Sequence, residues 1–536
     1  MTMEYRTLPR GFGKIQLLSA EAMFGQNGIW HAKDRHELST AINAHSSALY
    51  EIVRDNAVSP TVRKKIDQAI NLARSGNPLS DKAAHELVPM LNSAAFRTAG
   101  SSTMKWTAWV RGGKEGLEVV SKPKRFKPVS DLPQAEVFVQ VGDDLFNPIR
   151  ATTERVTRAV VGAIDETRRR YPAAKVEEFR ELAARVAEEG VFEPQNRKAL
   201  MKVDYKFVQG TDGKKRAAVI DVSSELLGAG FTDEVLKTYN LPTGLSKSLA
   251  HAFLNIHRDE SGTLPKTVAI MVRDKQLAEV FKRDIGALKE HLERILKQQN
   301  PEAAVNVVLQ QSVEKRVQGS RSADARNIPF TGLKVQDLST GKSISPDLLI
   351  RYGRFPLQDE ADEYLKAKGV KVLDWSDYVV AADKTVNGRV LNVLKLEPES
   401  AVFVPKNSAS QNSIFTQGYE QELDAAIERA KIEHWSGLVV KLPTKLAIGE
   451  TGQEAVTAHF VNPHSPLQVN ALKRAISLMS SRGNSLPASE KNKAKLTFEE
   501  LAVSSLPELG GKGLEIRTLA MPRFKVAKVT KFVSPT

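Results

Sequence analysis

The chain has 536 residues, 41% of them hydrophobic and 26% charged, which is the composition of an ordinary globular protein with roughly two to four domains. The absence of cysteine excludes disulfides, thiolate nucleophiles and cysteine-bound zinc or iron–sulfur sites. A formal net charge of +14 favours anionic partners, such as nucleic acid, an anionic membrane surface or a phosphate-bearing small molecule.

The N-terminal part, residues 1–111, is predicted to be mainly helical. Its opening residues, MTMEYRTLPRGFGK, lack the apolar core of a secretory signal, and no window of the chain approaches the roughly 18 to 20 apolar residues of a membrane span. A cytoplasmic protein without a membrane partner is therefore expected. Residues 112–135 are rich in Gly, Pro and Lys and predict a linker.

Residues 136–235 are predicted to form two amphipathic helices followed by a β-hairpin. The helices are NPIRATTERVTRAVVGAIDETRRR and AAKVEEFRELAARVAEEG, and the hairpin is MKVDYKFVQGTDGKKRAAVIDVSSE with its turn at GTDGK. Side chains alternate along a strand, so Asp221 and Ser223 share a face that Asp204 can reach from the other arm. Such hard oxygen ligands suit magnesium. The alternative is a solvated hairpin whose acids pair with neighbouring lysines.

Residues 236–382 alternate between strand and helix patterns. The apolar runs KTVAIMV, AVNVVLQ, DLLIRYG and VKVLDW are typical of buried strands, and amphipathic helices lie between them. This alternation predicts a parallel, Rossmann-like layer.

Residues 383–536 place cations beside a glycine-bearing loop. Lys441 ends the strand pattern SGLVVKLP, directly before TKLAIGETGQEAV, which holds Gly449 and Gly452. A strand lysine beside free backbone amides suits a polyphosphate, and Lys384 in AADKTVNG offers a second positive charge. Arg517 lies in the middle of a predicted closing hairpin, GLEIRTLAMPRFKVAKV. Taken singly, Lys441 is better explained as a strand-end lysine that extends to solvent, and Arg517 could equally pair with a nearby acid.

The joint order of these segments resembles an ATP-grasp domain. AADKTV, SGLVVKLP, the glycine-bearing loop and LEIRTLAM resemble its front half, and residues 201–233 resemble its back half. Here the back half comes first, which is similar to the circularly permuted ATP-grasp ligases, such as glutathionylspermidine synthase and eukaryotic glutathione synthetase. Where that family has Glu-x-Asn, this chain has Asp221-Val222-Ser223. Residues 1–110 have no counterpart in the family.

The resemblance implies an α/β fold: an ATP-grasp-like domain assembled from two separated segments, a Rossmann-like layer before its front half, and the N-terminal helical region. It further implies an ATP-dependent carboxylate–amine ligase that uses ATP and Mg²⁺, acts on small-molecule acid and amine substrates, and proceeds through an acylphosphate. The roles implied for individual residues are phosphate binding by Lys384 and Lys441, closure of the loop that contains Gly449 and Gly452, magnesium binding by Asp204, Asp221 and Ser223, and neutralisation of the acylphosphate by Lys202 and Arg517.

Two other functions remain open from the sequence. The Asp-x-Ser departure favours a catalytically degenerate ATP-grasp protein that acts by binding. The basic runs KPKRFKP, TRRRYP and RFKVAKVTKF would suit a nucleic-acid-binding protein, although no base-reading motif accompanies them. An SxxK spacing at Ser102 and a GKS tripeptide at Gly341 lack the partner motifs that an acyl-enzyme or a phosphate loop requires.

Overall fold

The structure is a computed structural model of the chain. The residues that it describes are 27–47, 49–50, 60–98, 106–111, 117–120, 135–174, 176–195, 200–209, 212–223, 230, 233–234, 237, 244–272, 278–279, 281–309, 335–352, 365, 367–373, 384–396, 400–441, 458–482, 491, 494–502, 514–520 and 532–533.

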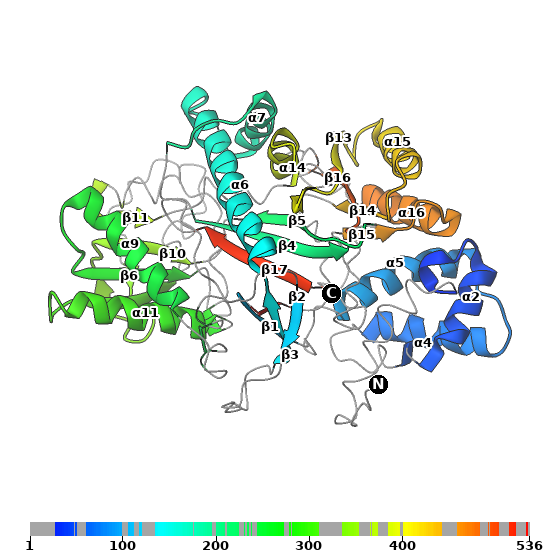
Figure 1. Cartoon of the computed structure of the whole chain (residues 1–536), viewed down its shortest axis with the longest axis horizontal. Coiled ribbons are helices and arrows are strands. Elements are labelled where there is room, and N and C mark those ends of the chain that lie inside the picture. Colours follow the sequence, from blue (N-terminus) through cyan, green and yellow to red (C-terminus); the bar gives the residue numbers. More distant parts are fainter. Residues whose placement is uncertain are drawn as a thin grey trace, which may run out of the picture.

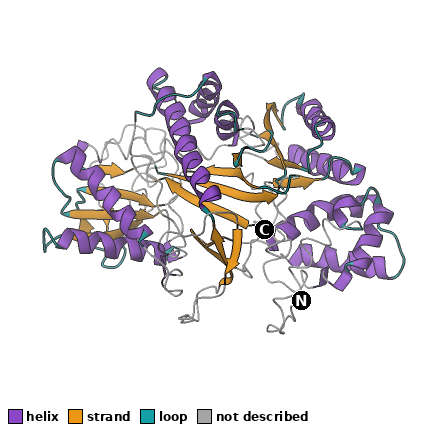
Figure 2. Cartoon of the chain, in the orientation of Figure 1, coloured by secondary structure: helices purple, strands orange, loops and turns teal. Residues whose placement is uncertain are grey.

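The fold is mixed α/β, with several small sheets rather than one large one (Figures 1 and 2). The helices are η2 (Ile29–His31), α2 (Arg35–Ala44), α4 (Pro60–Arg74), α5 (Asp81–Thr98), α6 (Asp143–Arg170), α7 (Val176–Glu189), α9 (Leu245–Ser261), α11 (Lys282–Lys297), α14 (Lys384–Val393), α15 (Tyr419–Ile432) and α16 (Pro466–Arg482). Among the described residues, no helix combines the length and apolar character needed to cross a membrane.

Two mixed or antiparallel sheets carry most of the residues singled out in the sequence. We call the first the hairpin sheet, in the order β12 (Val402–Phe403), β5 (Lys215–Ser223), β4 (Met201–Gln209) and β17 (Leu514–Ala520). We call the second the lysine sheet, in the order β13 (Asn407–Ser413), β16 (Lys495–Glu500), β14 (Leu438–Lys441) and β15 (Ala458–Val461).

The predicted Rossmann-like alternation is confirmed as a parallel four-stranded sheet. Its order is β11 (Lys371–Leu373), β10 (Leu348–Tyr352), β6 (Thr267–Val272) and β7 (Ala304–Leu309), and every pairing is parallel. All five residues of β10 are buried, as expected for a strand with both faces covered. A two-stranded ribbon of β8 (Val335–Gln336) and β9 (Ser343–Ile344) follows β7.

Two strands in the N-terminal third were not predicted. Trp106–Arg111 is a strand, β1, although it falls in the region predicted to be helical, and the predicted linker contains the strand β2 (Leu117–Val120). Both join β3 (Ala135–Val141) and β18 (Phe532–Val533) in one sheet. WTAWVR and LEVV are short β-prone runs, and the Gly, Pro and Lys residues around them obscured that pattern.

Helix α6 forms the backing of the hairpin sheet, across which it runs in Figure 1. Its buried positions run from Leu145 to Thr167. Acidic Asp143 and Asp144 lie in its first turn and three arginines in its last, which suits the helix dipole. Val156, Val160 and Ile164 lie in the same core as Val203 and Phe207 of β4. The predicted hairpin is confirmed: β4 pairs antiparallel with β5.

The N-terminal helices pack on the lysine sheet and its helix α16. Leu467 and Ala471 of α16 share a core with residues of α2, α4 and α5, and α5 lies beside α16 in Figure 1. The side chain of Trp30, 3% exposed, packs against Val439 of β14 and against Leu501. The described N-terminal helices are therefore packed against the C-terminal part of the chain.

Gly162 provides a test of how closely α6 packs against the backbone at Phe192. A Cβ on Gly162 would lie 2.7 Å from the carbonyl carbon of Phe192, whereas a Cβ on Gly286 in α11 would meet nothing within 4 Å. We expect Gly162→Ala to lower the free energy of unfolding by about 3 kcal/mol, because a backbone group must move. Gly286→Ala should instead raise it by about 0.5 to 1 kcal/mol, since alanine favours a helix. Urea denaturation of both variants measures the difference, and equal effects would contradict the described packing of α6.

Candidate functional site

The hairpin sheet brings residues from two distant parts of the chain onto one face. Asp204 of β4 lies directly opposite Asp221 of β5 on one side and opposite Arg517 of β17 on the other, and Lys202 lies opposite Ser223. Residues directly opposite one another in antiparallel strands project from the same face of the sheet. All five predicted residues of the hairpin and β17 therefore belong to one face, which we call the acidic face.

A β-bulge creates this arrangement. From the turn up to Tyr205↔Val219 the register of the hairpin is regular, but the next pair is Asp204↔Asp221, so Ile220 is an extra residue. Without it, Asp204 would lie opposite Ile220, and Asp221 would project from the other face. The bulge thus places the two carboxylates together.

Three residues of the acidic face are deeply buried, and Asp221 is partly exposed. Lys202 is 8% exposed, Asp204 3% and Ser223 2%. The Nζ of Lys202 lies 4.0 Å from Oδ2 of Asp204, which gives the buried carboxylate a positive neighbour. Ionised groups at this depth need a counter-charge or a bound ion, because burial removes their hydration.

The reverse face of the same sheet is tied to α6 by a buried polar cluster. The Oγ1 of Thr153 lies 2.8 Å from the hydroxyl of Tyr205 on β4 and 2.8 Å from Oγ1 of Thr518 on β17. Burial raises the pKa of the Tyr205 hydroxyl well above its ordinary value. The cluster joins α6, β4 and β17, and so fixes the strand that carries Arg517 against the strand that carries Asp204.

Lys441 ends β14 and lies on the face of the lysine sheet that also carries Val439, Ala458 and Thr497. Its Nζ forms an ion pair with the carboxylate of Glu499 on β16, and both side chains are about one-fifth exposed. This partner on the adjoining strand was missed in the sequence. It holds the lysine against the sheet rather than letting it extend into solvent.

Helix α14 links the two sheets and begins at Lys384. One turn later, Nδ2 of Asn387 donates a hydrogen bond of 2.9 Å to the carbonyl of Val222, between Asp221 and Ser223 of the hairpin sheet. The next residue, Gly388, packs so closely on β13 of the lysine sheet that a Cβ there would lie 2.8 Å from Oδ1 of Asn407. The helix therefore contacts both sheets. Gly449 and Gly452 lie outside the described residues.

The donors on the acidic face fit a magnesium ion shared with phosphate oxygens. No group of three or more His, Asp or Glu side chains suited to a metal exists among the described residues. Two opposed carboxylates and the hydroxyl of Ser223 are, however, the kind of set that magnesium uses when substrate phosphates and water complete its shell. The Oγ of Ser223 is buried and has no hydrogen-bond partner in the described part of the chain, so it remains available as a ligand.

A buried histidine lies beside Lys441's strand. His459 of β15 is opposite Val440, and burial lowers its pKa to about 4. Between pH 6.5 and 4 the unfolded chain therefore takes up a proton that the folded protein does not, so stability is full above pH 6.5 and falls as the pH drops toward 4. The loss corresponds to about 3 kcal/mol.

This dependence is measurable. The difference in unfolding free energy between the wild type and His459→Gln should change by about 3 kcal/mol between pH 7 and pH 4. His464, which is exposed, provides the control: His464→Gln should leave the pH dependence of the wild type in place. Parallel curves for wild type and His459→Gln would show that His459 is not buried as described.

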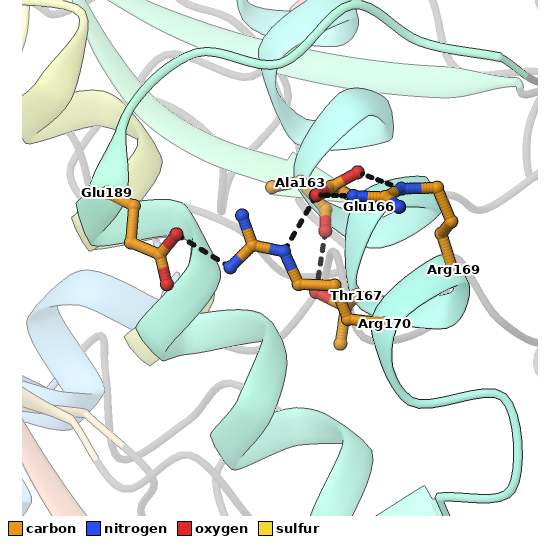
Figure 3. A network of polar contacts seen from close by, with 6 residues as sticks. All are labelled: Ala163, Glu166, Thr167, Arg169, Arg170 and Glu189. Carbon is orange, nitrogen blue, oxygen red and sulfur yellow. Dashed lines mark hydrogen bonds and ion pairs between the residues drawn. The ribbon is translucent and has the colours of Figure 1, made fainter.

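The basic run at the end of α6 is occupied by interactions within the protein (Figure 3). Arg169 and Arg170 both bind the carboxylate of Glu166, and Arg170 also binds Glu189 at 2.6 Å. The hydrogen bond from Arg169 has the largest effect and that from Arg170 the next, and together they lower the pKa of Glu166 to about 2. The guanidinium of Arg168 lies 4.2 Å from the ring centre of Phe179. KPKRFKP and nearly all of RFKVAKVTKF lie outside the described residues.

Comparison with known proteins identifies no family for this chain. No family model matches the sequence, and no curated protein is similar to it. Two solved structures share a general similarity. One is a glutathione synthetase-like effector from Globodera pallida, at 11% identity over 73% of this chain and 83% of that one, with a TM-score of 0.35. The other is assigned as a gamma-glutamylcysteine synthetase, from Methylobacillus flagellatus, at 14% identity over 70% of this chain and 80% of that one, with a TM-score of 0.36. At these scores the similarities carry no argument about function.

Proposed function

We propose that the protein is an ATP-dependent carboxylate–amine ligase whose nucleotide lies between the hairpin sheet and the lysine sheet. The observation that supports this most is the pairing of β17 with β4, together with the bulge at Ile220. The register of these strands assigns Lys202, Asp204, Asp221 and Arg517 to one face of the sheet. The hairpin and β17, which carry them, are separated by about 290 residues of sequence. A surface hairpin with solvated acids would not bury Asp204 to 3% exposure.

In this proposal the cations of the later segment bind the phosphates of ATP. Lys441 is held at the strand end by Glu499, so its ammonium is positioned before the nucleotide arrives. Lys384 would supply a second positive charge from the start of α14. Gly449 and Gly452 would allow the loop before β15 to approach the γ-phosphate and exclude water.

The residues of the acidic face would handle the reacting groups. Asp204, Asp221 and Ser223 would hold Mg²⁺, which when bound neutralises charge on the phosphate oxygens. Lys202 and Arg517 would bind the substrate carboxylate as it accepts the γ-phosphoryl group and ADP leaves. The amine then attacks the acyl carbon, the amide forms, and phosphate departs from the same cationic pair. The protein's contribution is positioning and charge stabilisation.

The parallel sheet is proposed to bind the acid or amine substrate. Residues 236–382 enclose it, between the hairpin segment and α14, and in open parallel sheets ligands bind at the carboxyl ends of the strands. Residues 136–235 and 383–536 would then be the two halves of the nucleotide-binding domain.

Phosphate release tests the proposal. The protein is incubated with ATP, Mg²⁺ and pools of amino acids, polyamines and other small carboxylates, and release is compared with and without each pool. We expect release that requires both an acid and an amine, and a product whose mass equals the two joined with loss of water. Nucleotide binding by calorimetry without release would instead identify the degenerate binding protein. Absence of any heat with ATP and Mg²⁺ at millimolar concentration would exclude both.

Nucleic-acid binding is the second function to measure. The arginines of TRRRYP are engaged with Glu166, Glu189 and Phe179, so this run offers little free charge to a phosphate backbone. Affinity for a mixed duplex that falls steeply between 50 and 200 mM salt would favour the nucleic-acid function.

A further inference from the structure

Two buried oxygens next to the acidic face have no hydrogen-bond partner among the described residues: Oγ of Ser223 and Oδ1 of Asn387. Ser223 is 2% exposed and Asn387 4%. Oxygens buried this deeply are nearly always hydrogen-bonded, because leaving one unpaired sacrifices its hydration. Ser223 follows Val222 in the chain, and Asn387 donates a hydrogen bond to the carbonyl of Val222, so both residues adjoin one peptide unit. Two unpaired buried oxygens on these residues indicate a ligand that both can bind.

The side chain of Asn387 is fixed in place. Its Nδ2 donates to the carbonyl of Val222, an interaction only the amide nitrogen can make, so the identity of the other atom as Oδ1 follows. Val386 and Val390, on either side of it in α14, lie in the same core as Val222. This packing and the hydrogen bond to Val222 together hold the side chain of Asn387 in position.

The ligand must be positively charged or a hydrogen-bond donor, because a carbonyl-type oxygen only accepts. Asp221 and Ser223 are the immediate neighbours of Val222, and Asp221 lies opposite Asp204. Two carboxylates, a hydroxyl and an amide oxygen form a set of hard oxygen donors, which favours magnesium over softer metals.

We infer that Asn387 is a further residue of the magnesium site, where its amide oxygen acts together with Asp221 and Ser223. This inference rests on the proposed function. It also explains how the chain functions with Asp221-Val222-Ser223 on the strand. Serine is the weaker donor at that position, and the helix next to it contributes the amide oxygen that the strand lacks.

Mn²⁺ binding tests the inference without relying on catalysis. Calorimetry measures the affinity of Mn²⁺ for the ADP-saturated protein, and separately the affinity of ADP without metal. We expect Asn387→Ala to weaken Mn²⁺ binding by about tenfold to a hundredfold and to leave metal-free ADP binding unchanged. Asn392→Ala is the matched control, because Asn392 lies on the same helix and is exposed; it should bind Mn²⁺ as the wild type does.

Rescue distinguishes a ligand from a structural amide. In the Asn387→Ala background, Ser223→Asn places an amide oxygen on the strand itself and should restore Mn²⁺ affinity to within a few-fold of the wild type. A purely structural Asn387 would show reduced thermal stability and no such rescue. If Asn387→Ala does not fold, Asn387→Asp is used, and its melting temperature should rise more with Mn²⁺ than that of the wild type.

The outcomes separate the two proposals. If the wild type binds both Mn²⁺ and ADP, and Asn387→Ala binds Mn²⁺ equally well, the inference is overturned and the ligase proposal stands. Wild type that binds ADP but no Mn²⁺ would overturn the inference by itself. Wild type that binds neither would overturn both.

Discussion

Replacing Lys441 by methionine is expected to lower ATP-dependent phosphate release by at least about a hundredfold. Methionine keeps most of the length of the lysine side chain and removes the charge that would bind phosphate. The loss should appear in the affinity for ATP and in the turnover rate, because phosphate charge is present in the ground state and redistributes during transfer. Steady-state kinetics with the acid and amine identified by the pool experiment measures both.

The ion pair with Glu499 makes this prediction specific. In Lys441→Met the carboxylate of Glu499 would face the phosphates without its counter-charge, and the double variant with Glu499→Gln should therefore regain part of the nucleotide affinity, although not the activity. Lys431, which pairs with Glu428 on the surface of α15, is the control: Lys431→Met should leave the kinetics unchanged. Full activity of Lys441→Met would refute the position proposed for ATP.

Replacing Trp30 by alanine is expected to lower the free energy of unfolding by about 3 to 5 kcal/mol, the range for removal of a buried aromatic side chain. Trp30 contacts the start of β14 on the face that Lys441 also occupies, and its carbonyl accepts a hydrogen bond of 2.6 Å from Nε2 of Gln468. Loss of the ring would leave a cavity between the N-terminal helices and the lysine sheet. Thermal or urea denaturation measures the effect, with Tyr171→Ala, at an exposed aromatic, as control.

A double-mutant cycle with Gly437 tests the contact itself. A Cβ on Gly437 would lie 2.8 Å from Cζ2 of Trp30, so Gly437→Ala should destabilise the wild type through that clash. In the Trp30→Ala background the space is open on that side, and the same change should cost much less. Additive effects would mean that the two residues are not in contact.

The sequence by itself determined much of the local structure. The hairpin of β4 and β5, the long helix α6 and the parallel alternation of β6, β7, β10 and β11 all follow from residue periodicity, which depends only on neighbouring positions. It also selected Asp204, Asp221 and Ser223 as a group, since a two-residue spacing places side chains on a common strand face. Lys202 was selected through the family resemblance alone. β-prone runs in charged or glycine-rich surroundings, such as β1 and β2, were missed because their pattern is too short.

Only the tertiary structure decided which segments meet. With a regular register counted from the turn, Asp221 would project from the face opposite to that of Asp204. The bulge at Ile220 brings the two residues onto the same face, and no local pattern in AAVIDVS predicts this bulge. The closing strand β17 pairs with β4. The contacts of Glu499 with Lys441 and of Asn387 with the carbonyl of Val222 depend on β16 and α14, which long-range packing brings to them. Such contacts are fixed by the sum of many weak interactions across the chain, and this is why no single stretch of sequence encodes them.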